Sequence, residues 1–220
     1  MRKVKLAPSL LNADFSDLRG AVSAIEGVAD VVHLDVMDGN FVPNITFGPL
    51  IVKAIRSITS LPLDVHLMIA HPAEYIEDFV KAGADWISFH AEVTRHPGEI
   101  LGLIHNYGKR AGVVINPQTP AARLFEYMEL LEFVLVMTVM PGFGGQEMIP
   151  DALSKVNELK QEAARRGMEI EVEVDGGVKT ENLELVLQAG ADIVVVGSSI
   201  YAARDPRQAA RDIRALLDGE

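Results

Sequence analysis

Residues 31–39 read VVHLDVMDG, and this stretch decides how the chain folds. Its β-branched and apolar residues predict a buried strand, and Gly39 predicts the turn that ends it. Side chains alternate along a strand, so His33 and Asp35 point to the same side. Polar groups in apolar surroundings are costly unless they pair or coordinate something. The stretch therefore predicts a strand with a functional site at its end.

Two further apolar strands end in the same way. His66 lies near the end of PLDVHLM (62–68), and Asp175 ends a strand in EVEVDGG (171–177). A single histidine or aspartate of this kind is more often a hydrogen-bonded structural residue. Four on neighbouring strand ends favour a metal site, with His33, Asp35, His66 and Asp175 as its ligands. Mixed nitrogen and oxygen ligands suit Zn²⁺, Fe²⁺, Mn²⁺ or Co²⁺, and the sequence does not choose among them.

Strand and helix patterns alternate along the whole chain. Strands are expected at 4–8, 31–36, 63–68, 86–91, 112–117, 133–139, 170–175 and 192–197. Helices are expected at 15–26, 48–58, 73–82, 97–107, 120–129, 151–166, 180–189 and 206–217. Eight strand–helix units predict an α/β fold of the (β/α)8 or TIM-barrel type, with a doubly wound open sheet as the main rival. In a barrel, the four ligand-type residues would share the rim where catalytic groups gather.

Composition narrows the class of protein. The chain has 220 residues, 49% hydrophobic and 23% charged, which predicts one catalytic domain over residues 1–220. A formal charge of −11 disfavours nucleic acid as a partner. No apolar run is long enough to predict a membrane span, and no signal-peptide pattern opens the chain, so we expect a cytoplasmic protein.

Glycine-rich loops follow the sixth, seventh and eighth predicted strands. They read PGFGGQ (141–146), VDGGVKTEN (174–182) and VGSSIYAARD (196–205). Small residues let backbone amides approach an anion, and barrels often bind phosphate after strands seven and eight. Each loop alone is typical of an ordinary turn, whereas the three together predict a phosphate site.

A metal ion, two carboxylates and a phosphate site suggest chemistry on a sugar phosphate. A metal can polarise a carbonyl and an adjacent hydroxyl, which stabilises an enediolate. One carboxylate can remove a carbon-bound proton while the other returns a proton to the opposite face. The sequence shows no Rossmann or Walker motif, which agrees with proton transfer that needs no redox cofactor.

Several motifs resemble the ribulose-phosphate 3-epimerase family over essentially the whole chain. They are APSLLNADF (7–15), HLDVMDGNFVPN (33–44), DVHLM (64–68), PGFGGQ (141–146), VDGG (174–177) and AGADIVVVGS (189–198). The resemblance implies a TIM barrel that interconverts D-ribulose 5-phosphate and D-xylulose 5-phosphate in the pentose phosphate pathway. It also implies a homo-oligomer, whose size the sequence does not give.

The resemblance implies roles for individual residues. Asp35 and Asp175 would be the catalytic acid and base, and they would bind one divalent ion per subunit together with His33 and His66. Substrate contacts would come from Ser9, His66, Asp175, the loop Gly142, Phe143, Gly144 and Gly145, and the phosphate-binding Gly176, Gly177, Gly197 and Ser198. Met37, Met68 and Met137 would line the reaction centre, although methionine in a strand is more often core filler.

Departures from the family pattern are modest, and alternatives stay open. Asn12, Met140 and Met148 stand where relatives often carry Ser, a polar residue and Phe, and the last two could alter the loop over the substrate. D-allulose 6-phosphate 3-epimerase is one alternative function. A phosphosugar-binding barrel without turnover is the other, whereas metal-assisted hydrolysis is disfavoured because the first strand lacks a His-x-His motif.

Three smaller expectations concern neighbouring polar residues. Glu173 shares a strand face with Asp175, and we expect Lys5 to neutralise it below the site. His90 is expected to be a satisfied core histidine rather than a group behind a metal ligand. Asp38 is expected to shape the turn around Gly39.

Overall fold

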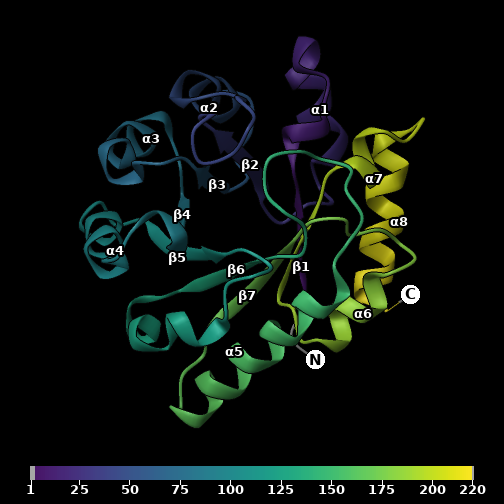
Figure 1. Cartoon of the computed structure of the whole chain (residues 1–220). Coiled ribbons are helices and arrows are strands. Elements are labelled where there is room, and N and C mark those ends of the chain that lie inside the picture. The colour runs from purple at the N-terminus through teal and green to yellow at the C-terminus, as the bar shows by residue number, and fades with distance from the viewer. Residues whose placement is uncertain (1–2, 220) are drawn as a thin grey trace.

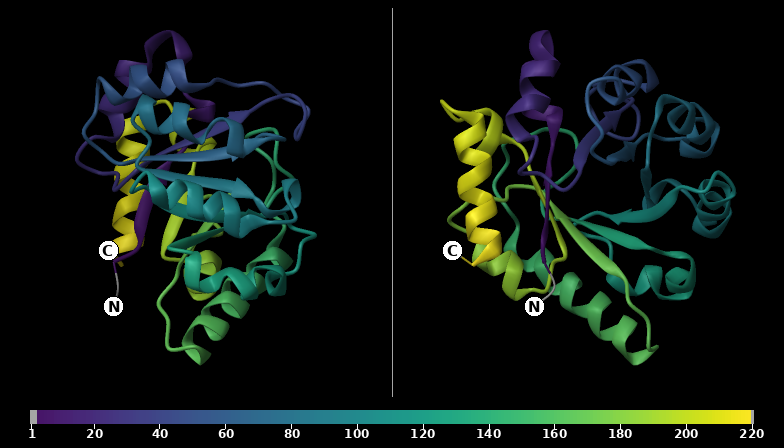
Figure 2. Two further views of the ribbon diagram at one scale, coloured as in Figure 1. Left: turned by 90° about the vertical axis from the view of Figure 1, so that its left-hand side faces the viewer. Right: turned by 180° about the vertical axis from the view of Figure 1, so that it is seen from behind.

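The computed structural model describes residues 3–219 and shows a ring of parallel strands surrounded by helices (Figures 1 and 2). The strands are β1 (Lys5–Pro8), β2 (Val32–Met37), β3 (Leu63–Met68), β4 (Trp86–His90), β5 (Arg110–Ile115), β6 (Phe133–Met137), β7 (Glu171–Asp175) and β8 (Ile193–Val196). They pair in the order β1-β8-β7-β6-β5-β4-β3-β2. A bridge between Ser9 and His33 brings β1 and β2 together. The fold is thus a (β/α)8 barrel, as the sequence predicted.

The helices follow the expected alternation. They are α1 (Leu18–Ile25), α2 (Pro49–Arg56), α3 (Ile76–Ala82), α4 (Pro97–Asn106), α5 (Ser154–Arg165), α6 (Leu183–Gln188), α7 (Ser198–Tyr201) and α8 (Pro206–Asp218). The segment predicted as a helix at 120–129 forms a 3-10 helix, η5 (Ala121–Leu130). The short helix α7 was not predicted, because its four residues are too few to show a helical period.

The first helix begins later than predicted because two aspartates cap successive turns. Asp14 accepts a hydrogen bond from the amide of Ser16 and caps the 3-10 turn Phe15–Asp17. Asp17 then accepts a hydrogen bond from the amide of Gly20 and caps α1. Each cap satisfies an amide that has no partner inside its helix. The helix start predicted at residue 15 therefore corresponds to the 3-10 turn capped by Asp14, and α1 itself begins after the second cap, Asp17.

Apolar side chains fill the layer between strands and helices. The outward-facing residues Leu34, Val65, Phe89, Val113 and Val172 are fully buried in one core that also contains the inner faces of the helices. Inside the barrel, Gly112 leaves room for the ring of Phe133, since a Cβ there would lie 2.4 Å from that ring. Burial on the outward face fixes which residues point inward, and this positions the site. None of the helices within residues 3–219 has the length and apolar character needed to cross a lipid bilayer.

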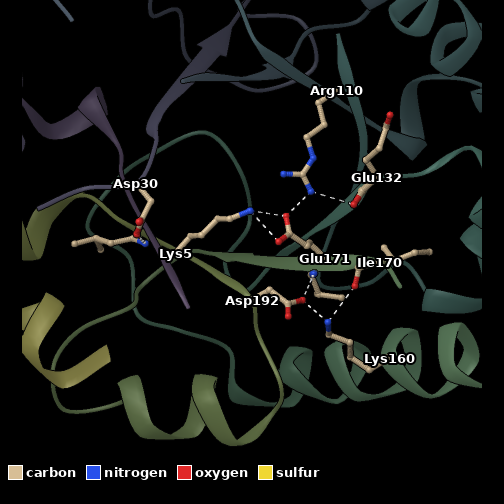
Figure 3. Close-up of polar contacts among 10 residues, drawn as sticks. Lys5, Asp30, Arg110, Glu132, Lys160, Ile170, Glu171 and Asp192 are labelled. Atoms are coloured by element: carbon tan, nitrogen blue, oxygen red, sulfur yellow. Dashed lines mark hydrogen bonds and ion pairs between the residues drawn. The ribbon is translucent and has the colours of Figure 1, made fainter. Parts of the chain in front are cut away.

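An ion cluster closes the amino-terminal end of the barrel (Figure 3). The ammonium of Lys5 donates to both carboxylate oxygens of Glu171 at 2.8 Å, and Arg110 pairs with the same carboxylate. The expected pairing of Lys5 with Glu173 is therefore wrong. Lys5 reaches the end of the barrel, where its side chain keeps 32% exposure, whereas Glu173 is fully buried. A lysine ammonium stays near water when it can, so it takes the partner beside the solvent.

Candidate metal and acid-base site

The four ligand-type residues converge at the carboxyl-terminal end of the barrel. His33 and Asp35 come from β2, His66 from β3 and Asp175 from β7, and one ligand atom of each lies within 4.8 Å of the others. Nε2 of His33 lies 3.4 Å from Oδ1 of Asp35, and Nδ1 of His66 lies 3.1 Å from the same oxygen. The strand register explains this closeness, since Asp35 and His66 stand side by side on β2 and β3. Two imidazoles and two carboxylates therefore face one point.

These four residues fit a divalent cation. Bonds of about 2.0–2.1 Å place the ligands of a tetrahedral zinc ion about 3.3 Å apart, close to the spacings around Oδ1 of Asp35. Within residues 3–219, Nε2 of His33 is buried and makes no hydrogen bond. Such a nitrogen is costly unless a ligand satisfies it. The donor set of two nitrogens and two carboxylates suits the borderline divalent metals, and it does not select one of them.

Asp64 contacts the ring nitrogen of His33 that faces away from the cluster. Its Oδ2 lies 2.7 Å from Nδ1 of His33, and both side chains are fully buried. Metal-binding histidines usually donate their second nitrogen to such a partner, which fixes the ring and its tautomer. Asp64 was missed by sequence reasoning, although its position two residues before His66 on the same strand face was a usable signal.

His90 stands behind the second histidine. Its Nε2 lies 2.8 Å from Nε2 of His66, and its Nδ1 lies 3.3 Å from Oε2 of Glu92. The ring is fully buried, and Phe41 packs against it with ring centroids 4.5 Å apart. His90 is a buried, hydrogen-bonded histidine, as expected, and it also contacts His66, because neighbouring strands β3 and β4 bring the two rings together.

The two candidate acid-base carboxyls differ in charge. Burial by itself would raise the pKa of Asp35, but the imidazoles of His33 and His66 hold it well below the usual range. Burial raises the pKa of Asp175 to about 7, and the negative charge of Asp35 adds to this effect. Burial would lower the pKa of His33, yet the carboxylates of Asp35 and Asp64 raise it well above the usual value. The surroundings therefore shift the pKa values of the two carboxyls in opposite directions, as is typical of an acid-base pair.

Ser9 lies at the site and contacts a protein group. Its hydroxyl donates a 2.6 Å hydrogen bond to Oδ2 of Asp35 and accepts one from the amide of Leu11. The residue is 4% exposed, and it follows β1 beside His33. The predicted substrate contact through Ser9 stays a prediction, while its hydrogen bond to Asp35 is a role that the sequence did not reveal.

The glycine loops meet above the same end of the barrel, and the loop after β6 crosses it (Figure 1). Asn12 touches two of them, because a Cβ on Gly144 or Gly197 would lie 2.6 or 2.8 Å from its Oδ1. Gly177 packs against the backbone of Met148, with 2.4 Å between that amide nitrogen and a Cβ built on the glycine. Among residues 3–219, no group accepts a hydrogen bond from the amide of Gly177.

The loop that follows β6 is fastened at both ends. Asn44 donates a 2.8 Å hydrogen bond to the carbonyl oxygen of Gly142, and Gln146 donates to the carbonyl oxygens of Met140 and Phe143. Phe143 is 56% exposed, and its predicted contact with substrate stays a prediction. Met140 is exposed, and its carbonyl oxygen accepts the hydrogen bond from Gln146.

The three methionines lie beside the cluster but do not form one group. Met37 and Met68 are neighbours on β2 and β3 and pack with Val42. Met137 is next to Asp175 in the register of β6 and β7, and it packs with Val114 and other residues of that side. All three methionines are at least 97% buried. They place apolar side chains on or beside the strands that carry Asp35 and Asp175.

A barrel of this kind, with a cation-ready cluster and two unequal carboxyls at its loop-rimmed end, has the construction of a metal-assisted proton-transfer protein. Residues 5–201 match the ribulose-phosphate 3 epimerase family, and the chain belongs to this family.

Curated relatives agree over nearly the full length. A ribulose-phosphate 3-epimerase of Bacillus subtilis (strain 168) is 50% identical over 213 residues, which cover 96% of this chain and 98% of that protein. A chloroplastic ribulose-5-phosphate-3-epimerase of Arabidopsis thaliana is 45% identical, over 96% of this chain and 76% of that protein. An Escherichia coli (strain K12) ribulose-phosphate 3-epimerase is 42% identical, over 99% and 97%.

Solved structures show the same barrel at lower identity. A crystal structure of 3-hexulose-6-phosphate synthase superposes with a TM-score of 0.74 at 20% identity, covering 96% of this chain and 98% of that one. A mutant tryptophan synthase alpha-subunit from Pyrococcus furiosus gives 0.72 at 20% identity, with 100% of both chains covered. At this level of identity the likeness concerns the fold alone.

Proposed function

We propose that this chain is an epimerase that interconverts D-ribulose 5-phosphate and D-xylulose 5-phosphate by proton transfer at C3. Membership of the family and the names of its curated relatives support this substrate. The observation that carries the mechanism is the pairing of Asp35 and Asp175, whose oxygens lie within 4.8 Å in one cluster and whose pKa values are shifted in opposite directions. The strands of one barrel carry the residues of this site, which supports one catalytic domain.

Each carboxyl has a defined task in this proposal. Ionised Asp35, whose Oδ2 accepts a hydrogen bond from Ser9, removes the C3 proton from one face of the sugar phosphate. Asp175, the other carboxyl of the cluster, delivers a proton to the opposite face of the enediolate. In the reverse direction the two carboxyls exchange tasks. Inversion at C3 follows because the proton leaves on one side and arrives on the other.

His33, Asp35, His66 and Asp175 would hold the divalent cation. When bound, this cation would supply electrostatic stabilisation of the negative charge that develops on the substrate oxygens. The buried methionines Met37, Met68 and Met137 keep water from this charge, so the protein dipoles act at low dielectric. The amide of Gly177, together with Gly176, Gly197 and Ser198, would receive the phosphate, and the loop 142–145 would cover the sugar.

Proton exchange with solvent tests the proposal. The metal-loaded chain is incubated with D-ribulose 5-phosphate in D₂O, and the products are followed by NMR. We expect deuterium at C3 in D-xylulose 5-phosphate, and a loss of about 10²–10⁴-fold in rate for Asp35→Asn and for Asp175→Asn. Full activity in both variants would exclude the two-carboxyl mechanism. D-allulose 6-phosphate is assayed in parallel, and a higher kcat/KM for it would replace the substrate named here.

A further inference from the structure

Three side chains form a continuous line behind the cluster. His66, from β3, lies with Nδ1 toward Asp35 and with Nε2 2.8 Å from Nε2 of His90. His90, at the end of β4, directs Nδ1 toward Oε2 of Glu92 at 3.3 Å. The two imidazole rings are stacked at 27° with centroids 5.0 Å apart, and both are fully buried. Polar groups held in this way have few alternative partners.

The acceptor at the end of this line is fixed. Oε1 of Glu92 accepts a 2.9 Å hydrogen bond from the amide of Asn116 and another from the hydroxyl of Thr119. The carbonyl oxygen of Asn116 in turn accepts a hydrogen bond from Lys155, which brings a positive charge close to this carboxylate. Glu92 is therefore a carboxylate that accepts hydrogen bonds and donates none. Its other oxygen, Oε2, is also a hydrogen-bond acceptor, so the group that faces it must be a donor.

The hydrogen-bond donors and acceptors between Glu92 and Asp35 determine the tautomers of His90 and His66. Nδ1 of His90 must carry a hydrogen, because it faces the carboxylate of Glu92. Nε2 of neutral His90 is then an acceptor, so Nε2 of His66 must carry the hydrogen that lies between the two rings. Nδ1 of His66 is left with a lone pair, and it faces Oδ1 of Asp35 at 3.1 Å. Two such acceptors repel each other unless a cation lies between them.

We propose that His90 and Glu92 are positioning residues that hold His66 as its Nε2–H tautomer and so present Nδ1 to the divalent cation. This inference rests on the proposed function, because it takes the cluster to be the cation site. The partner of the metal-facing histidine is here a second histidine, and the final acceptor comes from the loop after β4. Phe41, packed on His90, keeps water from competing for the hydrogen bond between the rings.

Cobalt binding without substrate tests the inference. The metal-stripped chain and its variants are titrated with Co²⁺ against a chelator, and the visible absorption of the bound ion is recorded. His90→Leu removes the acceptor, and we expect about 10–100-fold weaker binding and an altered spectrum. His90→Gln places an amide oxygen near the former Nε2, and it should restore binding to within about threefold of the wild type.

Variants of Glu92 test the same inference independently, in case a His90 variant does not fold. Glu92→Leu removes the acceptor for Nδ1 of His90, and we expect about tenfold weaker Co²⁺ binding. Glu92→Gln keeps an amide oxygen there, and the loss should be smaller. His105→Leu is the matched control, since it breaks a histidine–glutamate pair with Glu132 on the outside of the barrel. It should bind Co²⁺ like the wild type.

Folded His90→Leu or Glu92→Leu that binds Co²⁺ as tightly as the wild type overturns the inference. Equal weakening in His90→Leu and His90→Gln also overturns it, because ring packing rather than the hydrogen bond would then matter. Failure of the proposed function looks different: wild-type chain with tightly bound metal would show no deuterium uptake at C3. The two results come from separate measurements and can be told apart.

Discussion

The hydroxyl of Ser9 donates a 2.6 Å hydrogen bond to Oδ2 of Asp35, which joins the end of β1 to the candidate catalytic carboxyl on β2. The two strands meet here through the bridge between Ser9 and His33. Oδ1 of Asp35 faces both histidines, so Ser9 occupies the other oxygen and fixes the plane of the carboxyl. The closure of the barrel thus orients the group that would move the proton.

Ser9→Ala should lower kcat by about tenfold, because a hydrogen bond to a charged group contributes about 1.5–3 kcal/mol and part of this orients Asp35. Steady-state kinetics with D-ribulose 5-phosphate measures the effect. Ser16→Ala is the control, since the hydroxyl of Ser16 bonds to the surface residue Asp14. Unchanged kcat in Ser9→Ala would show that Asp35 needs no support from β1.

Asp64→Asn should weaken metal binding about 10–100-fold while leaving the barrel folded, because it removes the charged partner of His33. Competition with a chelator gives the affinity, and circular dichroism gives the fold. Asp85→Asn serves as the control, because Asp85 pairs with Arg56 away from the cluster. Equal affinity in the wild type and in Asp64→Asn would remove Asp64 from the support of the site.

Gly177→Ala should raise KM by about tenfold. Gly177 has φ +66, and a Cβ there would lie 2.4 Å from the amide nitrogen of Met148, so the loop after β6 must shift. Gly27→Ala is the control that shows the effect of backbone strain without a steric clash, because Gly27 has φ +77 with nothing within 4 Å of its Cβ position. Gly27→Ala should lose about 1 kcal/mol of stability from backbone strain alone. Gly177→Ala should lose more, because the collision adds to the strain, and KM should rise in Gly177→Ala alone.

Glu92 should make stability depend on pH in the acid range. Its hydrogen bonds with His90, Thr119 and Asn116 outweigh burial and lower its pKa to about 2. A lowered pKa stabilises the fold above the unfolded value of about 4.3 and loses this contribution as pH falls toward 2. Glu92→Gln should therefore be about 2 kcal/mol less stable than the wild type at pH 6, after allowance for solvent screening.

Urea unfolding at several pH values measures this difference. The stability difference between the wild type and Glu92→Gln should narrow steadily from pH 5 to pH 3, because Glu92 takes up a proton in the unfolded chain while it stays ionised in the folded protein. A gap of constant size over this range would mean that Glu92 titrates like a carboxyl exposed to water.

The residues of the ion cluster at the amino-terminal end of the barrel should contribute unequally to the stability of the fold. Glu171→Ala leaves Lys5 and Arg110 without their shared carboxylate and should cost about 2–3 kcal/mol, reduced from the value for fully buried pairs by partial exposure. Lys5→Met should cost less than about 1 kcal/mol, because Arg110 still pairs with Glu171.

Thermal and urea unfolding measure both costs. Lys81→Met, which breaks the exposed pair with Glu77, is the control and should be nearly neutral. A larger loss for Lys5→Met than for Glu171→Ala would contradict the shared-carboxylate arrangement shown in Figure 3.

Much of the site could be predicted because its members end apolar strands. Asp35, His66 and Asp175 lie in the later half of strands whose alternation is visible in the sequence, and parallel strands bring such ends together. His33 precedes Asp35 by two residues and therefore points to the same side. The turn around Gly39 was predicted for the same local reason, and Asp38 accepts hydrogen bonds from the amides of Asn40 and Phe41 there. The local sequence pattern was sufficient to predict a residue's place in the site where that place depends only on the residue's own strand or turn.

Partners on other strands could not be predicted in this way. Asp64 behind His33 and His90 behind His66 depend on the register between β2, β3 and β4, which no single segment encodes. Lys5 and Glu173 are both aligned with Ile193 on β8, yet the ammonium of Lys5 bonds to Glu171 near the solvent.

The sequence by itself determined the eight strand–helix units, the family and the residue types that gather at the strand ends, because alternation and motifs are local properties of the chain. Only the tertiary structure decided which side chain supports each ligand and where Lys5 finds its carboxylate. These pairings depend on strand register and on access to water, and both arise when the barrel closes.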